Sequence, residues 1–319
     1  MKGLELARGY WEAFGRDMLD RDFPALRDRI AVGLCGSGSE VLGFDDEISR
    51  DHDFEPGFCL FLPGEDAVDR REAFRLERAY AKLPKEFEGF RRAPISPVGG
   101  SRHGVLRLAD FLTEKTGAPD GRLSTWDWLT VPEQNLLEVT RGEIWQDPSG
   151  LMTEVRARLA RLPEDIRLRK LSGELLLMNQ SGQYNYRRCL DHGETGAALL
   201  AVGEFVQAAL HVFHLLAGAY LPYYKWAFRS LRALSPADAA RADRLTSLLS
   251  GGTAPDALED RELLMADLCQ DVSELLQDQG LTQASCCDLE QHAYSVADAI
   301  QDPELRNLHI LAGVKNDTH

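Results

Sequence analysis

The sequence predicts an α+β protein with a small mixed α/β domain over residues 1–150 and an all-α helical bundle over residues 151–319. Before Gly150, short apolar runs of strand length alternate with turns and amphipathic segments. After Gly150, apolar residues recur at helical spacing almost to the end of the sequence. A chain of 319 residues with 44% hydrophobic composition is also long enough to bury two separate cores.

The α/β half is expected to hold three strands and three helices. Pro63-Gly64 ends the second strand, and the stretch 85–104 is rich in Pro, Gly and Arg, which predicts an irregular connection. The expected strands cover residues 30–35, 51–62 and 104–108, and the expected helices cover residues 3–18, 65–83 and 132–139. The order strand, turn, strand and helix favours a small mixed sheet, and the Gly turn lacks the dinucleotide-binding fingerprint.

The second half is helical in pattern throughout. Several of its segments begin with Pro in the first turn, or with Asp or Ser at or before it, as helix starts require. The expected helices cover residues 151–161, 163–180, 194–220, 222–234, 236–249, 260–280 and 288–300.

A Gly/Ser turn follows the first expected strand. Gly36, Ser37, Gly38 and Ser39 form a flexible segment whose backbone N–H groups and hydroxyls can hold phosphate oxygens. This composition predicts that these four residues bind the phosphates of a ligand.

Two aspartates begin the second expected strand. Asp51 and Asp53 lie two residues apart, so in an extended segment both side chains leave the same face. Paired carboxylates suit Mg²⁺, which takes a few carboxylate oxygens and completes its octahedron with water and substrate phosphates. With the Gly/Ser turn, the pair predicts a metal-dependent site for a nucleoside triphosphate.

The spacing of these motifs resembles a known signature. Gly36-Ser37, thirteen further residues and then Asp51-His52-Asp53 are similar to the pattern of the DNA polymerase β-type nucleotidyltransferase superfamily. The resemblance implies a palm-like mixed-sheet domain, one or two Mg²⁺ ions on the aspartates, and a nucleoside triphosphate, with ATP the expected one, as co-substrate.

The superfamily commonly carries a third carboxylate on a later strand. Asp110, at the end of the third expected strand, is the nearby candidate in this chain. The sequence favours the alternative that Asp110 caps a helix or is a plain surface acid.

One apolar segment of the bundle, residues 197–219, carries a polar stripe. Glu204, Gln207, His211 and His214 fall within one narrow sector of a helix. One interpretation makes Glu204 the general base, its pKa raised by an apolar wall; another makes the stripe a satisfied core network. A metal site on the two histidines lacks a third ligand and is disfavoured.

The run 162–231 resembles the helical region of an uncharacterised bacterial family, a domain of unknown function in the nucleotidyltransferase class. That region is similar in arrangement to the C-terminal bundle of kanamycin and lincosamide nucleotidyltransferases. Residues 220–226, Tyr-Leu-Pro-Tyr-Tyr-Lys-Trp, match the family's most distinctive stretch. The resemblance implies a helical domain that closes over the substrate.

Two cations of this region are candidates for contacting the triphosphate. Lys225 lies within a turn of Pro222, at an expected helix start whose dipole favours anions, and Arg188 is the next candidate. The alternative is that each cation pairs with a carboxylate between helices, which 51 acidic residues make easy.

Together these features predict a transferase that moves a nucleoside monophosphate from a nucleoside triphosphate to a hydroxyl of an unknown acceptor, releasing pyrophosphate. A catalytically inactive nucleotide-binding protein, or a toxin–antitoxin-type transferase acting on a protein or tRNA, is the alternative. The acceptor is a small molecule or a macromolecule, and the chain is expected to be a monomer or homodimer.

The composition limits which binding partners and which cellular compartment are expected for this protein. A net charge of −15 argues against a broad nucleic-acid surface. No segment is expected to span a membrane, and residues 1–19 lack a signal-peptide core. Six cysteines without metal or disulfide spacing are expected to be reduced, which favours a cytoplasmic protein.

Overall fold

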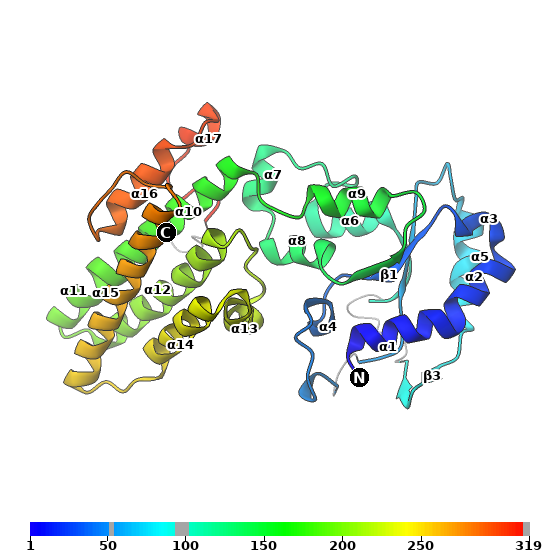
Figure 1. Ribbon diagram of the computed structural model, residues 1–319, viewed down its shortest axis with the longest axis horizontal. Coiled ribbons are helices and arrows are strands. Elements are labelled where there is room, and N and C mark those ends of the chain that lie inside the picture. The colour runs from blue at the N-terminus through cyan, green and yellow to red at the C-terminus, as the bar shows by residue number, and fades with distance from the viewer. Residues whose placement is uncertain (51–53, 93–101, 315–319) are drawn as a thin grey trace. The chain divides into compact units, whose positions relative to one another are not determined.

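The computed structural model describes residues 1–50, 54–92 and 102–314, which divide into two units (Figure 1). The first unit comprises residues 1–127 and 131–160, and the second comprises residues 128–130 and the chain from Arg161 onward. The first unit therefore extends beyond Gly150. Helix α9 (Leu151–Arg158), expected in the bundle, belongs to it.

A four-stranded mixed sheet in the order β5-β2-β1-β6 forms the centre of the first unit. Strand β1 runs antiparallel to β2 and β6, whereas β2 and β5 are parallel. Gly33 lies opposite Cys59, and Cys59 lies opposite Gly104. The end of β1 and the starts of β2 and β5 therefore meet at one end of the sheet. The strands are β1 (Ala31–Leu34), β2 (Cys59–Leu62), β5 (Gly104–Arg107) and β6 (Glu143–Gln146).

The first and third expected strands are confirmed, but the expected extent of the second was wrong. Strand β2 begins at Cys59, and residues 54–58 lie outside any strand. This segment contains Pro56, which has no N–H to donate to a ladder, and Gly57, whose lack of a side chain leaves room for His103. Strand β6 was not predicted from the sequence.

Helices cover both faces of the sheet. On one face, Tyr10 and Trp11 from the N-terminal helices pack with Leu60 of β2 and Leu76 of α5 in a single core. On the other face, Phe111 of α6 lies 5.3 Å from Phe61 between ring centroids. The remaining elements of this unit include a β3-β4 hairpin (Glu86–Phe87, Phe90–Arg91), a π-helical segment (Trp11–Gly15), a 3-10 turn (Ile48–Arg50) and the helices α1 (Gly3–Tyr10), α2 (Arg16–Asp22), α3 (Pro24–Arg27), α4 (Ser39–Leu42), α5 (Arg70–Ala81), α6 (Leu108–Thr116) and α8 (Glu133–Thr140); α7 (Thr125–Thr130) crosses from the first unit into the second.

The second unit is all helical over its described residues, as the sequence predicts. Helix α12 packs against α10, α11 and α14, and α10 also packs against α16. Its elements are α10 (Glu164–Met178), a π-helical segment (Asn179–Asn185), α11 (Tyr186–Asp191), α12 (Thr195–Leu216), α13 (Tyr224–Leu234), α14 (Pro236–Ser250), α15 (Pro255–Asp278), α16 (Leu289–Asp298) and α17 (Pro303–Arg306).

Helix α12 is the most apolar long helix of the second unit. By length and composition alone, this 22-residue helix could cross a membrane. However, 67% of its most apolar 18-residue window is buried inside the protein, the pattern of a helix at the centre of a bundle. Within the described chain it is the one helix that meets this test.

Candidate active site

The Gly/Ser turn lies directly after β1, at the sheet end where β2 and β5 begin. Gly36 and Gly38 have φ angles of +114° and +143°, which side-chain-bearing residues rarely adopt. The N–H of Gly36 donates to the carbonyl of Glu138 at 2.7 Å, so that amide is already used. The hydroxyls of Ser37 and Ser39 make no hydrogen bond to any other described residue.

The two predicted metal ligands, Asp51 and Asp53, lie outside the described residues, and their role stays a prediction. The described segment that follows them, beginning at Phe54, leads into β2. Since β2 begins beside the end of β1, this segment enters the sheet at the same end as the Gly/Ser turn.

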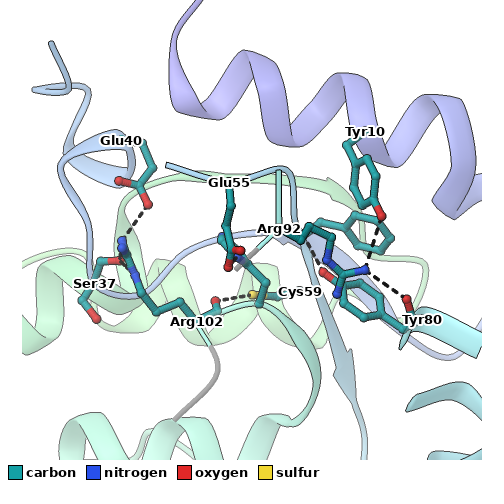
Figure 2. Close-up of polar contacts among 10 residues, drawn as sticks. Tyr10, Ser37, Glu40, Glu55, Cys59, Tyr80, Arg92 and Arg102 are labelled. Atoms are coloured by element: carbon teal, nitrogen blue, oxygen red, sulfur yellow. Dashed lines mark hydrogen bonds and ion pairs between the residues drawn. The ribbon is translucent and has the colours of Figure 1, made fainter. Parts of the chain in front are cut away.

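Arg102 is the side chain at this turn that the sequence did not single out. Its Nε and Nη2 atoms donate to the carbonyl oxygen of Ser37 at 3.2 and 2.5 Å, and Nη2 also lies 2.7 Å from Oε1 of Glu40. Figure 2 shows the guanidinium between these two acceptors. Arg102 reaches the Gly/Ser turn because β5, which follows it, pairs in parallel with β2. Local sequence patterns do not predict this pairing, so they could not identify Arg102 as a site residue.

A second polar group lies nearby at the start of β2. Glu55 is drawn between the Arg102 pair and a cluster built by Arg92 (Figure 2). Its carboxylate lies 3.4 Å from Nδ1 of the buried His103. The Arg92 guanidinium stacks on the Tyr80 ring at 4.6 Å and donates to the Tyr10 hydroxyl at 3.3 Å. Two arginines and a half-buried glutamate thus lie around the entry to β2.

The described carboxylates near the turn do not by themselves form a metal site. Glu40 is paired with Arg102 and Glu55 with His103, while the buried Asp45 accepts from the Gly3 N–H at 2.8 Å and so caps α1. Within the described parts of the chain, no three His, Cys, Asp or Glu side chains come together as metal ligands.

Two buried thiols lie behind the turn: Cys59 begins β2, and Cys35 directly follows β1. Burial raises the pKa of the Cys59 thiol from 9.0 to about 12 and holds the pKa of Cys35 well above its ordinary value. Both thiols therefore stay protonated near neutral pH, which argues against a cysteine nucleophile here.

Asp110 lies in the first turn of α6 and is exposed, as the surface-acid alternative predicts. Strand β5 enters the sheet beside the start of β2 and ends at Arg107, just before this helix. Asp110 therefore follows the end of β5 that is remote from the Gly/Ser turn.

The polar stripe of α12 divides into two parts. Glu204 and Gln207 are exposed, so the apolar wall on which a base role for Glu204 depended is absent. His211 contacts Glu174 of α10 at 2.7 Å, and His214 contacts the carbonyl of Leu210 and the hydroxyl of Ser230. The two histidines therefore form a core network, the alternative that the sequence left open.

The two predicted phosphate contacts of the second unit are both exposed. Nζ of Lys225 lies 5.1 Å from the centroid of the Trp226 ring, and the Arg188 guanidinium lies 5.1 Å from that of Tyr184. Neither cation makes an ion pair with a described carboxylate, in contrast to the paired-cation alternative.

Lys225 and Arg188 lie near opposite ends of α12. Helix α12 has 22 residues, so its length is about 33 Å. Arg188 lies on α11, which ends shortly before the first residue of α12. Lys225 lies on α13, whose Ser230 hydroxyl contacts His214 near the last residue of α12. These two side chains are therefore too far apart to contact one phosphate group.

The second unit also contains a cavity of about 320 Å³ between the first turn of α10 and the C-terminal end of α12. Arg161, Arg167 and Gln279 are among the residues that line it. None of the predicted site residues does.

Comparisons with known proteins give two findings. A crystal structure described as a nucleotidyltransferase-like protein from Exiguobacterium sibiricum 255-15 is similar over 91% of this chain and 81% of that chain, with 15% identity and a TM-score of 0.38. No curated protein matches the sequence. Residues 128–227 match a family described as a domain of unknown function (DUF4037), which confirms for this segment the expected resemblance to an uncharacterised family.

Proposed function

We propose that this protein is a metal-dependent nucleotidyltransferase that acts at the Gly/Ser turn. The observation that carries the proposal is topological: the turn after β1 and the starts of β2 and β5 meet at one end of the sheet. The motif that resembles the nucleotidyltransferase signature is divided between that turn and the segment ahead of β2. The strand order therefore supports the proposal that the two halves of this motif lie close together.

In the proposed reaction, the hydroxyls of Ser37 and Ser39 and the backbone amides of the turn other than that of Gly36 hold the triphosphate. A hydroxyl of the acceptor attacks the α-phosphorus in line. The bond from that phosphorus to the bridging oxygen breaks, pyrophosphate leaves, and the acceptor's proton passes to a base. Mg²⁺ held by Asp51 and Asp53 would neutralise the charge of the triphosphate.

The sequence offers the candidates for the proton acceptor and for the nucleotide contacts. Glu204 remains our candidate from the sequence, and it is an exposed residue of the second unit. Lys225 and Arg188 remain candidates for contacts with the nucleotide. Since they lie near opposite ends of α12, we propose that one of them at most contacts the triphosphate.

The test is release of pyrophosphate from each labelled nucleoside triphosphate with Mg²⁺, with and without fractions of cell extract as a source of acceptor. We expect Asp51→Asn and Asp53→Asn each to lower transfer at least about 100-fold. The unfolding midpoint should stay unchanged. Asp28→Asn, an exposed acid of the same unit, is the matched control and should transfer normally. Full activity in Asp53→Asn would remove the proposal.

A nucleotide-binding protein without catalysis is the second candidate. It is favoured by the pairing of the described carboxylates near the turn, since Glu40 contacts Arg102, Glu55 contacts His103 and Asp45 contacts Lys2. Such a protein would be stabilised against heat by ATP and Mg²⁺ and would release no pyrophosphate with any extract fraction. If transfer does occur, the net charge of −15 favours a protein or a small molecule over tRNA as acceptor.

A further inference from the structure

We propose that Arg102 binds the triphosphate at the Gly/Ser turn, and that Glu40 holds its guanidinium there until the nucleotide arrives. This inference rests on the proposed function. It adds a substrate-binding residue and a competing acid, neither of which belongs to the sequence motif.

The backbone of Arg102 is fixed beside the start of β2. Its carbonyl oxygen accepts from the Cys59 thiol at 3.5 Å, and the N–H of Gly104 donates to the carbonyl of Phe58 at 2.9 Å. Strand β2 lies between β5 and β1 in the sheet. To reach Ser37, the Arg102 side chain therefore crosses the start of β2, where the segment after Asp53 enters.

The guanidinium lies against the backbone of the turn itself. A Cβ atom added to Gly38 would come within 2.1 Å of Nη2 of Arg102 and 2.3 Å of Oε1 of Glu40. The absence of a side chain at Gly38 is therefore what lets the ion pair rest on the turn. Phosphate oxygens gripped by this turn would meet the same guanidinium.

Charge favours an exchange of partners. The pair is largely shielded from solvent, with the Arg102 side chain 27% exposed and that of Glu40 13%. A guanidinium binds phosphate and carboxylate groups through the same planar fork of N–H donors. A triphosphate carries several negative charges where Glu40 carries one, so it should displace Glu40 from Arg102.

The two partners should then affect binding in opposite directions. Arg102→Ala removes a ligand of the phosphates, and we expect it to weaken binding of ATP and of inorganic tripolyphosphate, each with Mg²⁺, by about 10- to 100-fold. Glu40→Gln removes the competitor, and we expect it to tighten binding about 3- to 10-fold. Both constants are measured by calorimetry.

Two further variants complete the experiment. Arg102→Lys keeps the charge but loses the fork, so its affinity should fall between those of the wild type and Arg102→Ala. Arg70→Ala breaks the exposed pair with Glu65 on the same unit and should change affinity less than about twofold. The unfolding midpoint of each variant without ligand shows whether the unit remains folded.

The outcomes separate this inference from the function on which it rests. If the wild type binds neither ATP nor tripolyphosphate, both fall. If the wild type binds and transfers but Glu40→Gln weakens binding as Arg102→Ala does, the pair is structural and only the inference falls. Unchanged affinity in a folded Arg102→Ala variant also overturns it.

Discussion

Nδ1 of His211 lies 2.7 Å from Oε1 of Glu174 and joins α12 to α10 inside the helical unit. Both side chains are largely buried. We expect Glu174→Ala to lower the free energy of unfolding by about 1–3 kcal/mol, because His211 would lose a buried partner. Urea denaturation measures this change, and a variant as stable as the wild type would show that the contact contributes little.

Glu204 lies on the same helix but faces solvent. Glu204→Gln should therefore leave the free energy of unfolding within about 0.5 kcal/mol of the wild type. Pyrophosphate release by this variant then tests the proposed base without interference from unfolding. A normal rate would exclude Glu204 as the proton acceptor.

Gly38 and Gly43 differ in what surrounds them, although both have positive φ. Gly38 has φ +143° with Arg102 and Glu40 against it, whereas Gly43 has φ +73° and nothing within 4 Å of an added Cβ. We expect Gly38→Ala to weaken ATP binding, since the ion pair must move off the turn. Gly43→Ala should cost about 1 kcal/mol of stability from its backbone alone and leave ATP affinity unchanged. Equal ATP affinities in the two variants would contradict this expectation.

The buried thiols predict how stability depends on pH. Burial raises the pKa of Cys59 from 9.0 to about 12, and that of Cys269 likewise. Between these values the folded protein keeps protons that the unfolded chain releases, so the free energy of unfolding should fall as pH rises. Each thiol should contribute a slope of about 1.4 kcal/mol per pH unit.

In Cys59→Ala, the free energy of unfolding should therefore fall less steeply between pH 9 and 10.5, by about 1.4 kcal/mol per pH unit. Cys287→Ala is the control, because Cys287 is exposed and solvent reaches its thiol in the folded and unfolded states alike. Denaturant midpoints measured across the pH range give the slopes. Parallel curves for Cys59→Ala and the wild type would count against deep burial of this thiol.

Two glycines of the second unit should respond to alanine with opposite signs. Gly203 lies inside α12 with open space around an added Cβ, so Gly203→Ala should stabilise the protein by about 0.5–1 kcal/mol. A Cβ on Gly182 would come within 2.4 Å of the Phe205 ring. Gly182→Ala should therefore destabilise by about 1–3 kcal/mol. Thermal unfolding of both variants measures the difference, and changes of the same sign would contradict the packing of α12.

Local patterns predicted much of the fold because they depend on neighbours in the chain. Apolar runs of four to six residues identified β1 and β5, and Pro or Asp at the first turn located helix starts such as those of α14 and α16. The same reasoning overextended the second strand, because Pro56 and Gly57 end the ladder inside an otherwise plausible run. Strand β6 is short and half-buried, and no periodicity marks it.

The sequence by itself determined the Gly/Ser turn, the aspartate pair and the change from mixed to helical structure near the middle of the chain, since each depends on residue types at short spacing. Only the tertiary structure placed Arg102 on that turn, because the parallel pairing of β5 with β2 joins segments with no local relation. Likewise, only packing decided that His211 and His214 lie in the core while Glu204 faces water. One helical stripe contains all three, and the neighbouring helices cover only part of it.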